Sequence, residues 1–342
     1  MSGLSSPKPL RVGILGAGRI AKVHVQSLQR IGADIVIIAD PIGNVAETVA
    51  ANFRIASWTK NVSEVFQADI DAVVICSPTA LHAEQIIEAA HYKKHIFCEK
   101  PLDLNLEVVD KAIKAVSDAG VKLVIGFNRR YDSNFLRIKK AINCEEIGKV
   151  NMLRITSRDP ELPPIEYIKG SGGIFCDMTI HDFDMARFLI GGEVDEVFAM
   201  GHSNNPEVAA VGDIDTAVIL LKFCNGVICN IENSREAVFG YDQRVEALGS
   251  KGSVLCDNNY ENQVVLSTKE NVHRDLPQRF IVERYMDAYV AEMEAFARVC
   301  TTDAPSPVGG EAARDALLLA LAASKSLAEN RPVKVDEIRK ST

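Results

Sequence analysis

Two polar residues, Asp177 and His181, lie four positions apart in a stretch whose apolar pattern predicts a helix. At this spacing both side chains face the same side of a helix, with their Cβ atoms about 5–6 Å apart. A carboxylate there can hold an imidazole in one tautomer while the imidazole moves a proton. Lys100, in the sequence Glu-Lys-Pro after an apolar run, could polarise an alcohol or carbonyl oxygen. These residues predict acid–base catalysis of hydride transfer, provided that the chain also binds a nicotinamide.

A glycine-rich turn near the N-terminus predicts that cofactor. The apolar run 10–15 has the composition of a buried parallel strand, and a helical pattern follows the turn. Gly16 permits a tight turn, and Gly18 lets the backbone approach a pyrophosphate. The helix start, with Arg19 and Ile20, offers N–H groups and a favourable dipole to the phosphates. The order strand, turn and helix is typical of a dinucleotide-binding unit.

The acidic residue at the end of the next strand indicates which dinucleotide binds. Strand 35–39 ends in Asp40, about 20 residues after the glycine turn, where a carboxylate accepts hydrogen bonds from a ribose 2′-hydroxyl. It would also repel a 2′-phosphate, and residues 41–44 contain no Arg or Lys to bind one. The sequence therefore favours NAD over NADP. Asp40 could instead cap the helix predicted from residue 44, but this alternative explains less.

Composition excludes several other classes of protein. The 342 residues are 47% apolar and 25% charged, as in a globular protein with room for two domains. A net charge of −8 argues against nucleic acid or an anionic membrane as a partner. No apolar run reaches the roughly 18 residues of a membrane span, and the N-terminus lacks the apolar core of a secretory signal. The eight cysteines are scattered without a C-x-x-C pair, so we expect reduced thiols, no metal site and a cytoplasmic location.

The pattern of elements changes near residue 150 and predicts two domains. The first part alternates strands and helices, which indicates an α/β Rossmann domain over residues 1–126. Residues 127–342 should form an α+β domain with a large, mostly antiparallel open sheet, and its last segment could return to the first domain. The strands expected after residue 150 are 150–157, 194–201, 216–223, 227–233, 244–248, 253–256 and 263–267, followed by helices 280–298 and 309–329 and a short strand at 332–335.

Taken together, the chain resembles the glucose–fructose oxidoreductase, inositol dehydrogenase and rhizopine-catabolism (Gfo/Idh/MocA) family, over nearly its whole length. The motifs that carry the resemblance, in order, are Gly16-x-Gly18-x-x-Ala21, Ser77-Pro78-Thr79 with His82, Glu99-Lys100-Pro101, Gly126 to Tyr131, Asp177-x-x-x-His181 and Gly240-Tyr241-Asp242. Residues 157–160 and 173–187 look most like the inositol 2-dehydrogenase branch.

The resemblance implies a role for each matched residue. Lys100, which in relatives often precedes a cis proline bond, would orient the reacting hydroxyl, His181 would be the general acid and base, and Asp177 its partner or a substrate ligand. The substrate-binding positions that it implies are Arg129, Arg158, Asp159, Asp177, His181, Asp184 and Tyr241. The cofactor-binding positions are Gly16, Gly18, Arg19, Ile20, Asp40, Ser77, Thr79, His82, Glu99 and Lys100.

The implied activity is NAD-dependent oxidation of a cyclic polyol, most simply myo-inositol to 2-keto-myo-inositol (scyllo-inosose). Some inositol dehydrogenases carry His-Arg-Asn where this chain has Ser157-Arg158-Asp159, so another inositol isomer or a pyranose sugar stays open. A non-catalytic NAD-binding sensor is a further alternative, although the chain keeps Lys100, Asp177 and His181. Relatives pair through the second domain's sheet, often as tetramers, so we expect a homotetramer.

Overall fold

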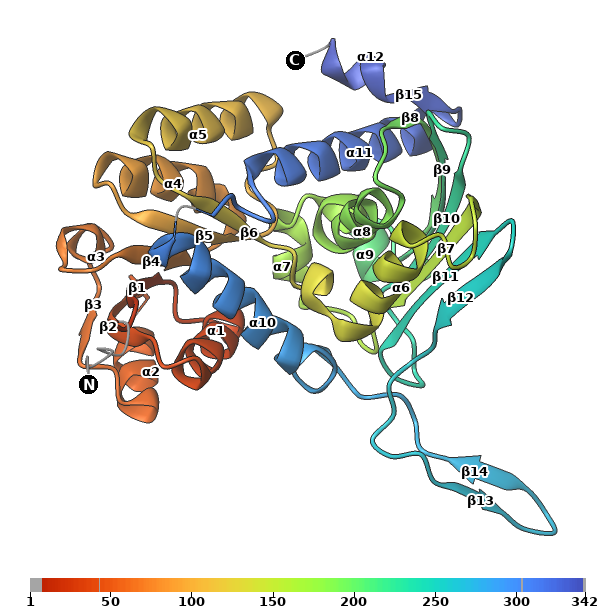
Figure 1. Ribbon diagram of the computed structural model, residues 1–342, viewed down its shortest axis with the longest axis horizontal. Coiled ribbons are helices and arrows are strands. Elements are labelled where there is room, and N and C mark those ends of the chain that lie inside the picture. The colour runs from red at the N-terminus through yellow and green to blue at the C-terminus, as the bar shows by residue number, and fades with distance from the viewer. Residues whose placement is uncertain (1–7, 43, 303, 341–342) are drawn as a thin grey trace, which may run out of the picture. The chain divides into compact units, whose positions relative to one another are not determined.

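The computed structural model describes residues 8–42, 44–302 and 304–340, and its chain divides into two compact units (Figure 1). The N-terminal unit comprises Met1–Asn128 and Asp287–Arg314, and the C-terminal unit comprises Arg129–Met286 and Asp315–Thr342. The two-domain prediction placed one boundary at residue 126, and it did not include residues 287–314 in the first unit. No helix that the structure describes is long and apolar enough to span a membrane.

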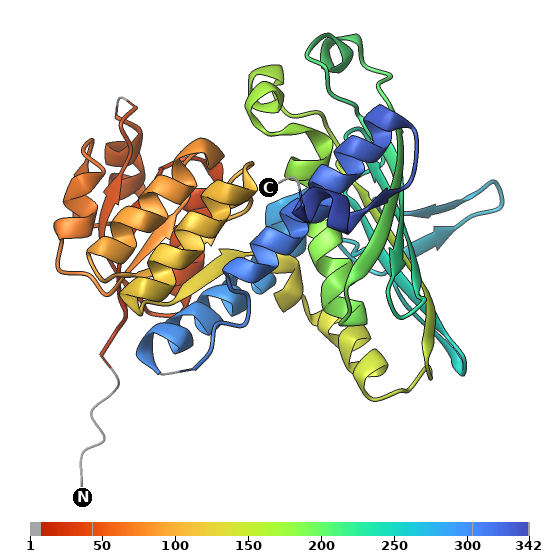
Figure 2. The same ribbon diagram turned by 90° about the horizontal axis from the view of Figure 1, so that it is seen from above.

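The N-terminal unit is built on a parallel sheet with helices on both faces. Its strands lie in the order β3 (Ser57–Thr59), β2 (Asp34–Ala39), β1 (Arg11–Leu15), β4 (Ala72–Ile75), β5 (His95–Glu99) and β6 (Leu123–Gly126). Helices α4 (His82–His91) and α5 (Leu106–Ala119) cover one face, and α1 (Arg19–Arg30) and α2 (Val45–Phe53) cover the other (Figures 1 and 2). The inner residues of β1, β2, β4, β5 and β6 are mostly apolar because both faces of the sheet are buried there.

The strand order of this sheet fixes where a ligand can bind. β1 pairs in parallel with β2 on one side and with β4 on the other, so the chain reverses its direction of progress across the sheet at β1. Ligands of open parallel sheets bind beyond the carboxyl ends of the strands at such a switch point. The residues that directly follow β1 and β2 there are Gly16 and Asp40.

The C-terminal unit is built on a mixed sheet that is mostly antiparallel. Its strands lie in the order β12 (Gly252–Cys256), β11 (Asp242–Gly249), β7 (Val150–Arg158), β10 (Ile228–Ser234), β9 (Thr216–Phe223), β8 (Val194–His202) and β15 (Val333–Lys334). β7 and β10 pair in parallel, whereas the neighbouring pairs are antiparallel. The predicted fold class is therefore confirmed. The short strand expected at 332–335 is β15, which pairs with β8 of this sheet, so the end of the chain belongs to the C-terminal unit and not to the first domain.

Helices cover one face of this second sheet and leave the other face open. In β9 alternate residues from Ala217 to Phe223 are buried, which fits a sheet with one packed face. The covering helices include α6 (Ser133–Asn143), α8 (Ile180–Ile190) and the part of α11 (Gly310–Glu329) that belongs to this unit, and Figures 1 and 2 show no described helix of the unit on the opposite face.

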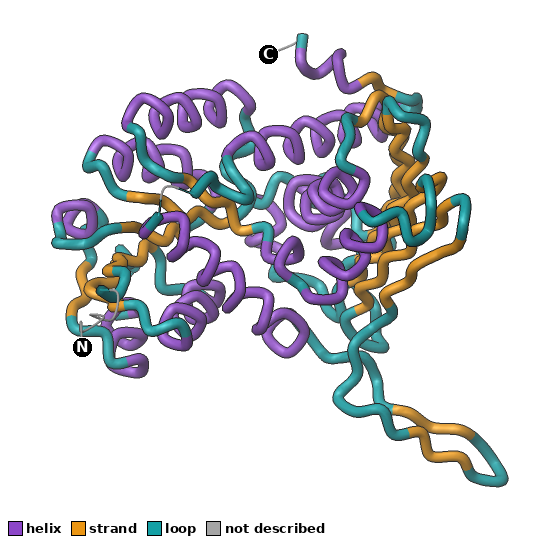
Figure 3. The backbone as a smooth tube through the Cα atoms, viewed as in Figure 1, coloured by secondary structure: helices purple, strands orange, loops and turns teal. Residues whose placement is uncertain are grey.

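The structure corrects two of the predicted elements. Residues 263–267 do not join the large sheet, because β13 (Val265–Ser267) pairs with β14 (Val272–Arg274) in a separate exposed hairpin (Figure 3). The stretch before α8 is not a regular helix either, since Phe175–Thr179 form a π-helical turn. Sequence patterns did not reveal the short helices α3 (Ser63–Gln67), α7 (Ile165–Gly170), α9 (Pro206–Ala210) and α12 (Val335–Arg339), nor did they reveal the longer α6.

A buried carboxyl group within the N-terminal unit has no hydrogen-bond partner among the described residues. Glu292 lies in α10 (Ile281–Thr301), its side chain is fully buried, and both of its oxygens are unpartnered. Burial first, and then the negative charge of Glu99, raise the pKa of Glu292 well above its usual range. We therefore expect Glu292 to be protonated, and so uncharged, in the folded protein at neutral pH.

Replacing Glu292 with Gln should remove a pH-dependent loss of stability. Only the unfolded state releases the Glu292 proton as the pH rises above the unfolded pKa of about 4.3, so the free energy of unfolding falls by about 1.4 kcal/mol per pH unit until the folded pKa is reached. Urea unfolding midpoints at pH 5 and pH 8 should therefore diverge between wild type and Glu292→Gln, with the variant relatively more stable at pH 8. Glu294→Gln, an exposed position in the same helix, is the control. Parallel pH dependences would contradict the assignment.

Candidate active site

The turn after β1 has the geometry that a pyrophosphate requires. Gly16 has a φ of 88°, and a Cβ atom placed on it would lie 2.6 Å from the carbonyl oxygen of Cys76, so a side chain is excluded. Gly18 precedes α1, and a Cβ there would meet no described atom within 4 Å. The N-cap residue of this helix makes no side-chain hydrogen bond, and backbone N–H groups at the first turn of a helix, here at Arg19 and Ile20, are suited to binding an anion. The residues present therefore fit a dinucleotide.

Asp40 contributes to the same site and also holds the turn in place. Its Oδ2 atom accepts a hydrogen bond from the Ala17 N–H at 2.9 Å, and its Oδ1 atom accepts one from the Ile42 N–H at 2.9 Å. An ionised carboxylate has about four acceptor positions, so ribose hydroxyls can use those that remain. Asn44, rather than Asp40, occupies the N-cap position of α2. The alternative of a simple helix cap therefore does not describe its contacts.

The residues after β4 mainly connect neighbouring strand ends. His82 is buried, and its two ring nitrogens lie 2.8 Å from the carbonyl oxygens of Pro101 and Ser77. Burial lowers the pKa of His82, against the opposing effect of these carbonyls. The Ser77 hydroxyl donates to Gln85 at 2.6 Å, and Thr79 begins a short 3₁₀ helix with its side chain partly exposed. The described contacts of His82 are thus structural, and they fix the loop that carries Ser77 and Thr79.

Glu99 holds the backbone of the predicted catalytic lysine, Lys100, in place. One carboxylate oxygen of Glu99 lies 2.6 Å from Nε2 of the buried His24, and the other accepts the Lys100 backbone N–H at 3.2 Å. Gly126 on the neighbouring strand leaves room for this carboxylate, because a Cβ there would come within 3.1 Å of it. The Lys100–Pro101 peptide bond is cis, as the resemblance implies. Glu99 therefore holds the end of β5 in place from inside the unit.

In the C-terminal unit, Asp177 and His181 do not share one regular helix. Asp177 lies in the π-helical turn, whereas His181 belongs to the first turn of α8. A π-helical turn bonds i to i+5, so the spacing expected for an α-helix does not apply across it, and such turns are frequent at functional sites. Asp177 accepts hydrogen bonds from the Tyr167 hydroxyl at 2.7 Å and from Arg235 Nη1 at 3.0 Å. Both side chains are partly buried rather than fully exposed.

A buried network centred on Asp182 fixes the helix that carries His181. The Asp182 carboxylate is fully buried and accepts from Arg129 Nη1 at 2.6 Å, from Ser157 Oγ at 2.6 Å and from Asn233 Nδ2 at 2.8 Å. Arg129, a predicted substrate ligand, is therefore held in a buried ion pair at the start of this unit. The neighbouring Tyr241 is buried as well, and burial raises its pKa above the usual range.

The remaining predicted substrate residues also have partners within the unit. Asp184 forms a buried, bidentate ion pair with Arg130: Nε donates to Oδ2 at 2.8 Å and Nη2 donates to Oδ1 at 2.5 Å. Its carboxylate therefore binds α8 to the segment after residue 128. Arg158 pairs with Glu232 at 2.9 Å and with Asp242 at 3.3 Å. The backbone N–H of Asp159 donates to the Ser234 carbonyl at 2.9 Å.

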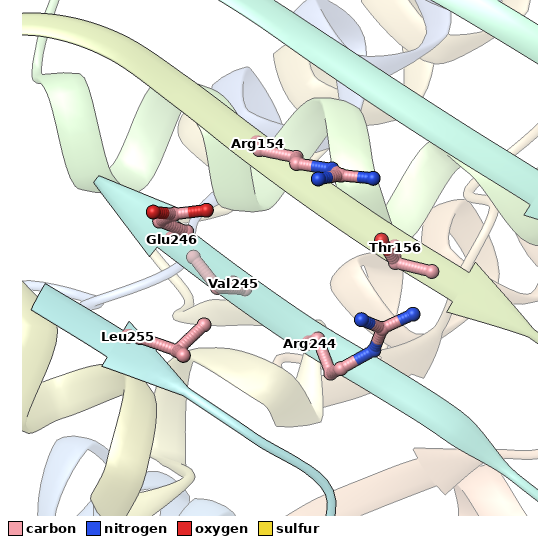
Figure 4. Close-up of a pocket in the computed structure, with 6 residues that line it drawn as sticks. All are labelled: Arg154, Thr156, Arg244, Val245, Glu246 and Leu255. Atoms are coloured by element: carbon pink, nitrogen blue, oxygen red, sulfur yellow. The ribbon is translucent and has the colours of Figure 1, made fainter. Parts of the chain in front are cut away.

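Sequence reasoning missed the residues that hold these groups. Tyr167, Arg235 and Asp182 contact Asp177 or Arg129, but Tyr167 and Arg235 belong to segments without a recognisable motif. Asp182 alone gave a signal, because it directly follows His181. A surface hollow on the sheet of the same unit contains no predicted site residue; it is lined by Arg154, Thr156, Arg244, Val245, Glu246 and Leu255 of β7, β11 and β12 (Figure 4).

Comparison with known proteins identifies the family. Residues 10–127 match the model of the oxidoreductase family with an NAD-binding Rossmann fold, and residues 135–255 match the GFO/IDH/MocA C-terminal domain. The chain belongs to the GFO/IDH/MocA oxidoreductase family. It is 47% identical to the uncharacterized oxidoreductase YrbE of Bacillus subtilis, over 97% of this chain and 98% of that protein. It is 45% identical to the myo-inositol 2-dehydrogenase of Thermotoga maritima, over 96% and 99%.

Solved structures of GFO/IDH/MocA proteins share the same architecture. A myo-inositol dehydrogenase from Corynebacterium glutamicum superposes with a TM-score of 0.91 at 38% identity, covering 96% of this chain and 99% of that one. A scyllo-inositol dehydrogenase from Lactobacillus casei, solved with NAD(H) and scyllo-inositol, gives a TM-score of 0.90 at 27% identity, over 96% and 100%. The predictions of an oxidoreductase and of NAD as its cofactor are confirmed.

Replacing Asp40 with Ala should relax the choice of dinucleotide. The variant loses hydrogen bonds to the ribose and the charge that opposes a 2′-phosphate. The value of kcat/KM with NAD should therefore fall, by an amount that corresponds to about 1–3 kcal/mol of lost transition-state binding. If the substitution only loosened the glycine turn, kcat/KM would fall equally with NAD and NADP. Loss of discrimination instead lowers the ratio of kcat/KM with NAD to kcat/KM with NADP. Asp118→Ala, an exposed carboxylate on α5, should leave the ratio unchanged. A wild-type preference for NADP would contradict the role of Asp40.

Proposed function

We propose that this protein is an NAD-dependent inositol 2-dehydrogenase that oxidises a ring hydroxyl of myo-inositol to 2-keto-myo-inositol. The observation that carries the proposal is the match, along nearly the whole of both chains, to the myo-inositol 2-dehydrogenase of Thermotoga maritima. A scyllo-inositol 2-dehydrogenase of Bacillus subtilis is 36% identical over 97% of this chain, which makes another inositol isomer the second candidate.

The proposed chemistry assigns one task to each of three residues. Lys100 donates a hydrogen bond to the reacting hydroxyl oxygen and stabilises the negative charge that develops on it. His181 accepts the hydroxyl proton, and Asp177 is a ligand of the polyol and steadies the imidazolium electrostatically. NAD⁺, when bound, supplies the two-electron acceptor for the carbinol C–H. Retention of Lys100, Asp177 and His181 together favours an enzyme over a non-catalytic sensor.

The density of polar groups supports a polyol rather than a simple alcohol. Buried donors and acceptors that a ligand leaves unpaired cost about 1–3 kcal/mol each, so a site rich in them favours a ring with a hydroxyl on every carbon. The substrate-binding positions that the resemblance implies are Arg129, Arg158, Asp159, Asp177, His181, Asp184 and Tyr241. Because Asp184 and Arg129 already form buried ion pairs, we assign them mainly to orienting α8 and the polar groups beside it.

Removing the side chain of His181 or Lys100 should strongly lower turnover, and the His181 variant should keep its affinity for the cofactor. With myo-inositol and NAD⁺, His181→Ala should lower kcat by about 10²–10⁴, the usual contribution of a general base. Lys100→Ala should also lower kcat strongly, and the dissociation constant of NADH, measured by fluorescence, should hardly change in His181→Ala. His91→Ala, an exposed histidine at the end of α4, is the control. Near-normal turnover by either site variant, or a wild-type preference for an acyclic alcohol or a hydroxy acid, would overturn the proposal.

We further propose that the protein is a cytoplasmic homotetramer that assembles through the open face of the second sheet. Met152, Ile228 and Leu248 lie side by side on β7, β10 and β11, and each is nearly half exposed. Other exposed apolar residues of this sheet are Met200, Val218, Leu220 and Leu255. Apolar patches of this kind are typical of subunit interfaces, and symmetric pairing of two copies would bury this one. None of the eight cysteines, all of which the structure describes, forms a disulfide, which suits a reducing compartment.

A charge on this face should break the assembly. Ile228→Asp places a carboxylate between Met152 on β7 and Lys222 on β9, on the face that would be buried between subunits, so light scattering should show a smaller oligomer than the wild-type protein at micromolar concentration. Leu136→Asp, at a similarly exposed apolar position on α6, should keep the wild-type mass. A wild-type monomer, or an Ile228→Asp variant with unchanged mass, would contradict the proposed interface.

A further inference from the structure

His24 is a buried histidine of the N-terminal unit that the proposed chemistry does not use. It lies in α1, and its side chain is fully buried. Its ring packs edge-on against Phe97 and Tyr289, with ring centroids 4.9 Å and 5.5 Å apart. Nε2 lies 2.6 Å from Oε1 of Glu99, whereas Nδ1 has no hydrogen-bond partner among the described residues. A buried polar pair of this kind is often no more stable than apolar residues of the same size, so stability alone does not account for it.

The partner of His24 supports the residue that carries the proposed chemistry. One oxygen of Glu99 faces His24, and the other accepts the backbone N–H of Lys100 at 3.2 Å. A carboxylate offers only acceptors, so an N–H at Nε2 is the tautomer of His24 that fits this contact. One carboxylate thus joins the imidazole on α1 to the backbone from which the Lys100 side chain begins. Without the imidazole, a buried oxygen of Glu99 loses its hydrogen bond, and the carboxylate is free to turn away from Lys100.

The neighbouring strand confines the same carboxylate. Gly126 lies opposite Glu99 where β6 pairs with β5. A Cβ atom on Gly126 would lie 3.1–3.2 Å from three atoms of the Glu99 carboxyl group, Cδ, Oε2 and Oε1, and the carboxylate would have to shift by a few tenths of an ångström. The position of Glu99 therefore depends both on the space above Gly126 and on the hydrogen bond from His24.

The contact of His24 also relates two parts of the proposed site. α1 begins directly after the glycine turn, where its backbone N–H groups suit a pyrophosphate. His24 lies in the second turn of this helix, and Glu99 follows 75 residues later in the chain. Their hydrogen bond fixes the carboxyl end of β5 against the helix that follows the glycine turn. Misplacing a catalytic group by about 1 Å can cost about a hundredfold in rate, so this link bears on turnover.

We propose that His24 is a positioning residue for the proposed oxidation: through Glu99 it holds the Lys100 backbone where the lysine side chain meets the reacting hydroxyl. This inference rests on the proposed dehydrogenase activity and adds a residue that the implied site positions do not include. The hydrogen bond from Lys100 strengthens as negative charge develops on the reacting oxygen. Loss of His24 therefore lowers kcat and kcat/KM together and leaves the KM for the polyol nearly unchanged.

Three substitutions test the link from different sides. His24→Leu keeps an apolar side chain among the aromatic rings but removes the donor to Glu99, so kcat with myo-inositol and NAD⁺ should fall about 10–100-fold. His24→Gln returns an N–H donor at nearly the same distance from the backbone, so it should recover most of the lost kcat. Gly126→Ala keeps His24 but displaces the Glu99 carboxylate, so it should lower kcat as well. In all three variants the KM for myo-inositol should stay within about twofold of the wild-type value.

Val25→Ala, a buried apolar position in the same helix, is the matched control: it lowers the melting temperature but leaves the pair intact, so kcat should not change. In the protein without cofactor, hydrogen exchange at the Lys100 amide should be faster in His24→Leu than in the wild type or Val25→Ala, because Glu99 no longer protects this N–H.

Several outcomes would overturn the role of His24 and leave the dehydrogenase intact. These are an unchanged kcat in His24→Leu, an equal loss of kcat in Val25→Ala, and a loss in His24→Gln as large as that in His24→Leu. Unchanged exchange at the Lys100 amide in His24→Leu would also overturn it, whether or not the protein turns over. A wild-type protein that oxidises no polyol would overturn the proposed function, and this inference with it.

Discussion

The buried carboxylate of Asp182 is the interaction on which the C-terminal unit most depends. It joins α8, the strands β7 and β10, and the segment after residue 128 through Asn233, Ser157 and Arg129. Removing one partner of a buried charged pair costs about 3–5 kcal/mol, because the other charge is left without compensation. The geometry of His181 follows from this network, since His181 is the residue before Asp182 in the same helix.

Buried charged groups are also paired around the other residues of the proposed chemistry, in both units. Arg235 forms ion pairs with both Asp177 and Asp213. Arg130 forms one with Asp184. Glu99, the residue before Lys100, contacts His24. Each of these buried charges has a partner, so their directions are fixed by packing rather than by solvent. Rigid surroundings of this kind are what binding and catalytic groups need, because small misplacements of a polar group lower the rate steeply.

Most regular elements could be predicted because their signals are local. The strands from β1 to β6 are short apolar runs in an alternating order, and only β3, which contributes a short edge strand, escaped detection. The strand expected at 263–267 was assigned to the wrong sheet, because an alternating pattern does not say which strand will be its neighbour. The π-helical turn before α8 could not be foreseen, since it has almost the composition of an ordinary helix.

The cofactor-binding unit could be derived from the sequence alone, because the glycine turn, the helix after it and Asp40 act through backbone geometry over about 25 consecutive residues. It also determined which acid, base and lysine were candidates for chemistry. The partners of those residues could be read only from the folded chain. Asp177 is held by Arg235, 58 positions away, and Arg129 by Asp182, 53 positions away. Such pairs depend on the path of the whole chain, which brings together side chains that no local spacing relates.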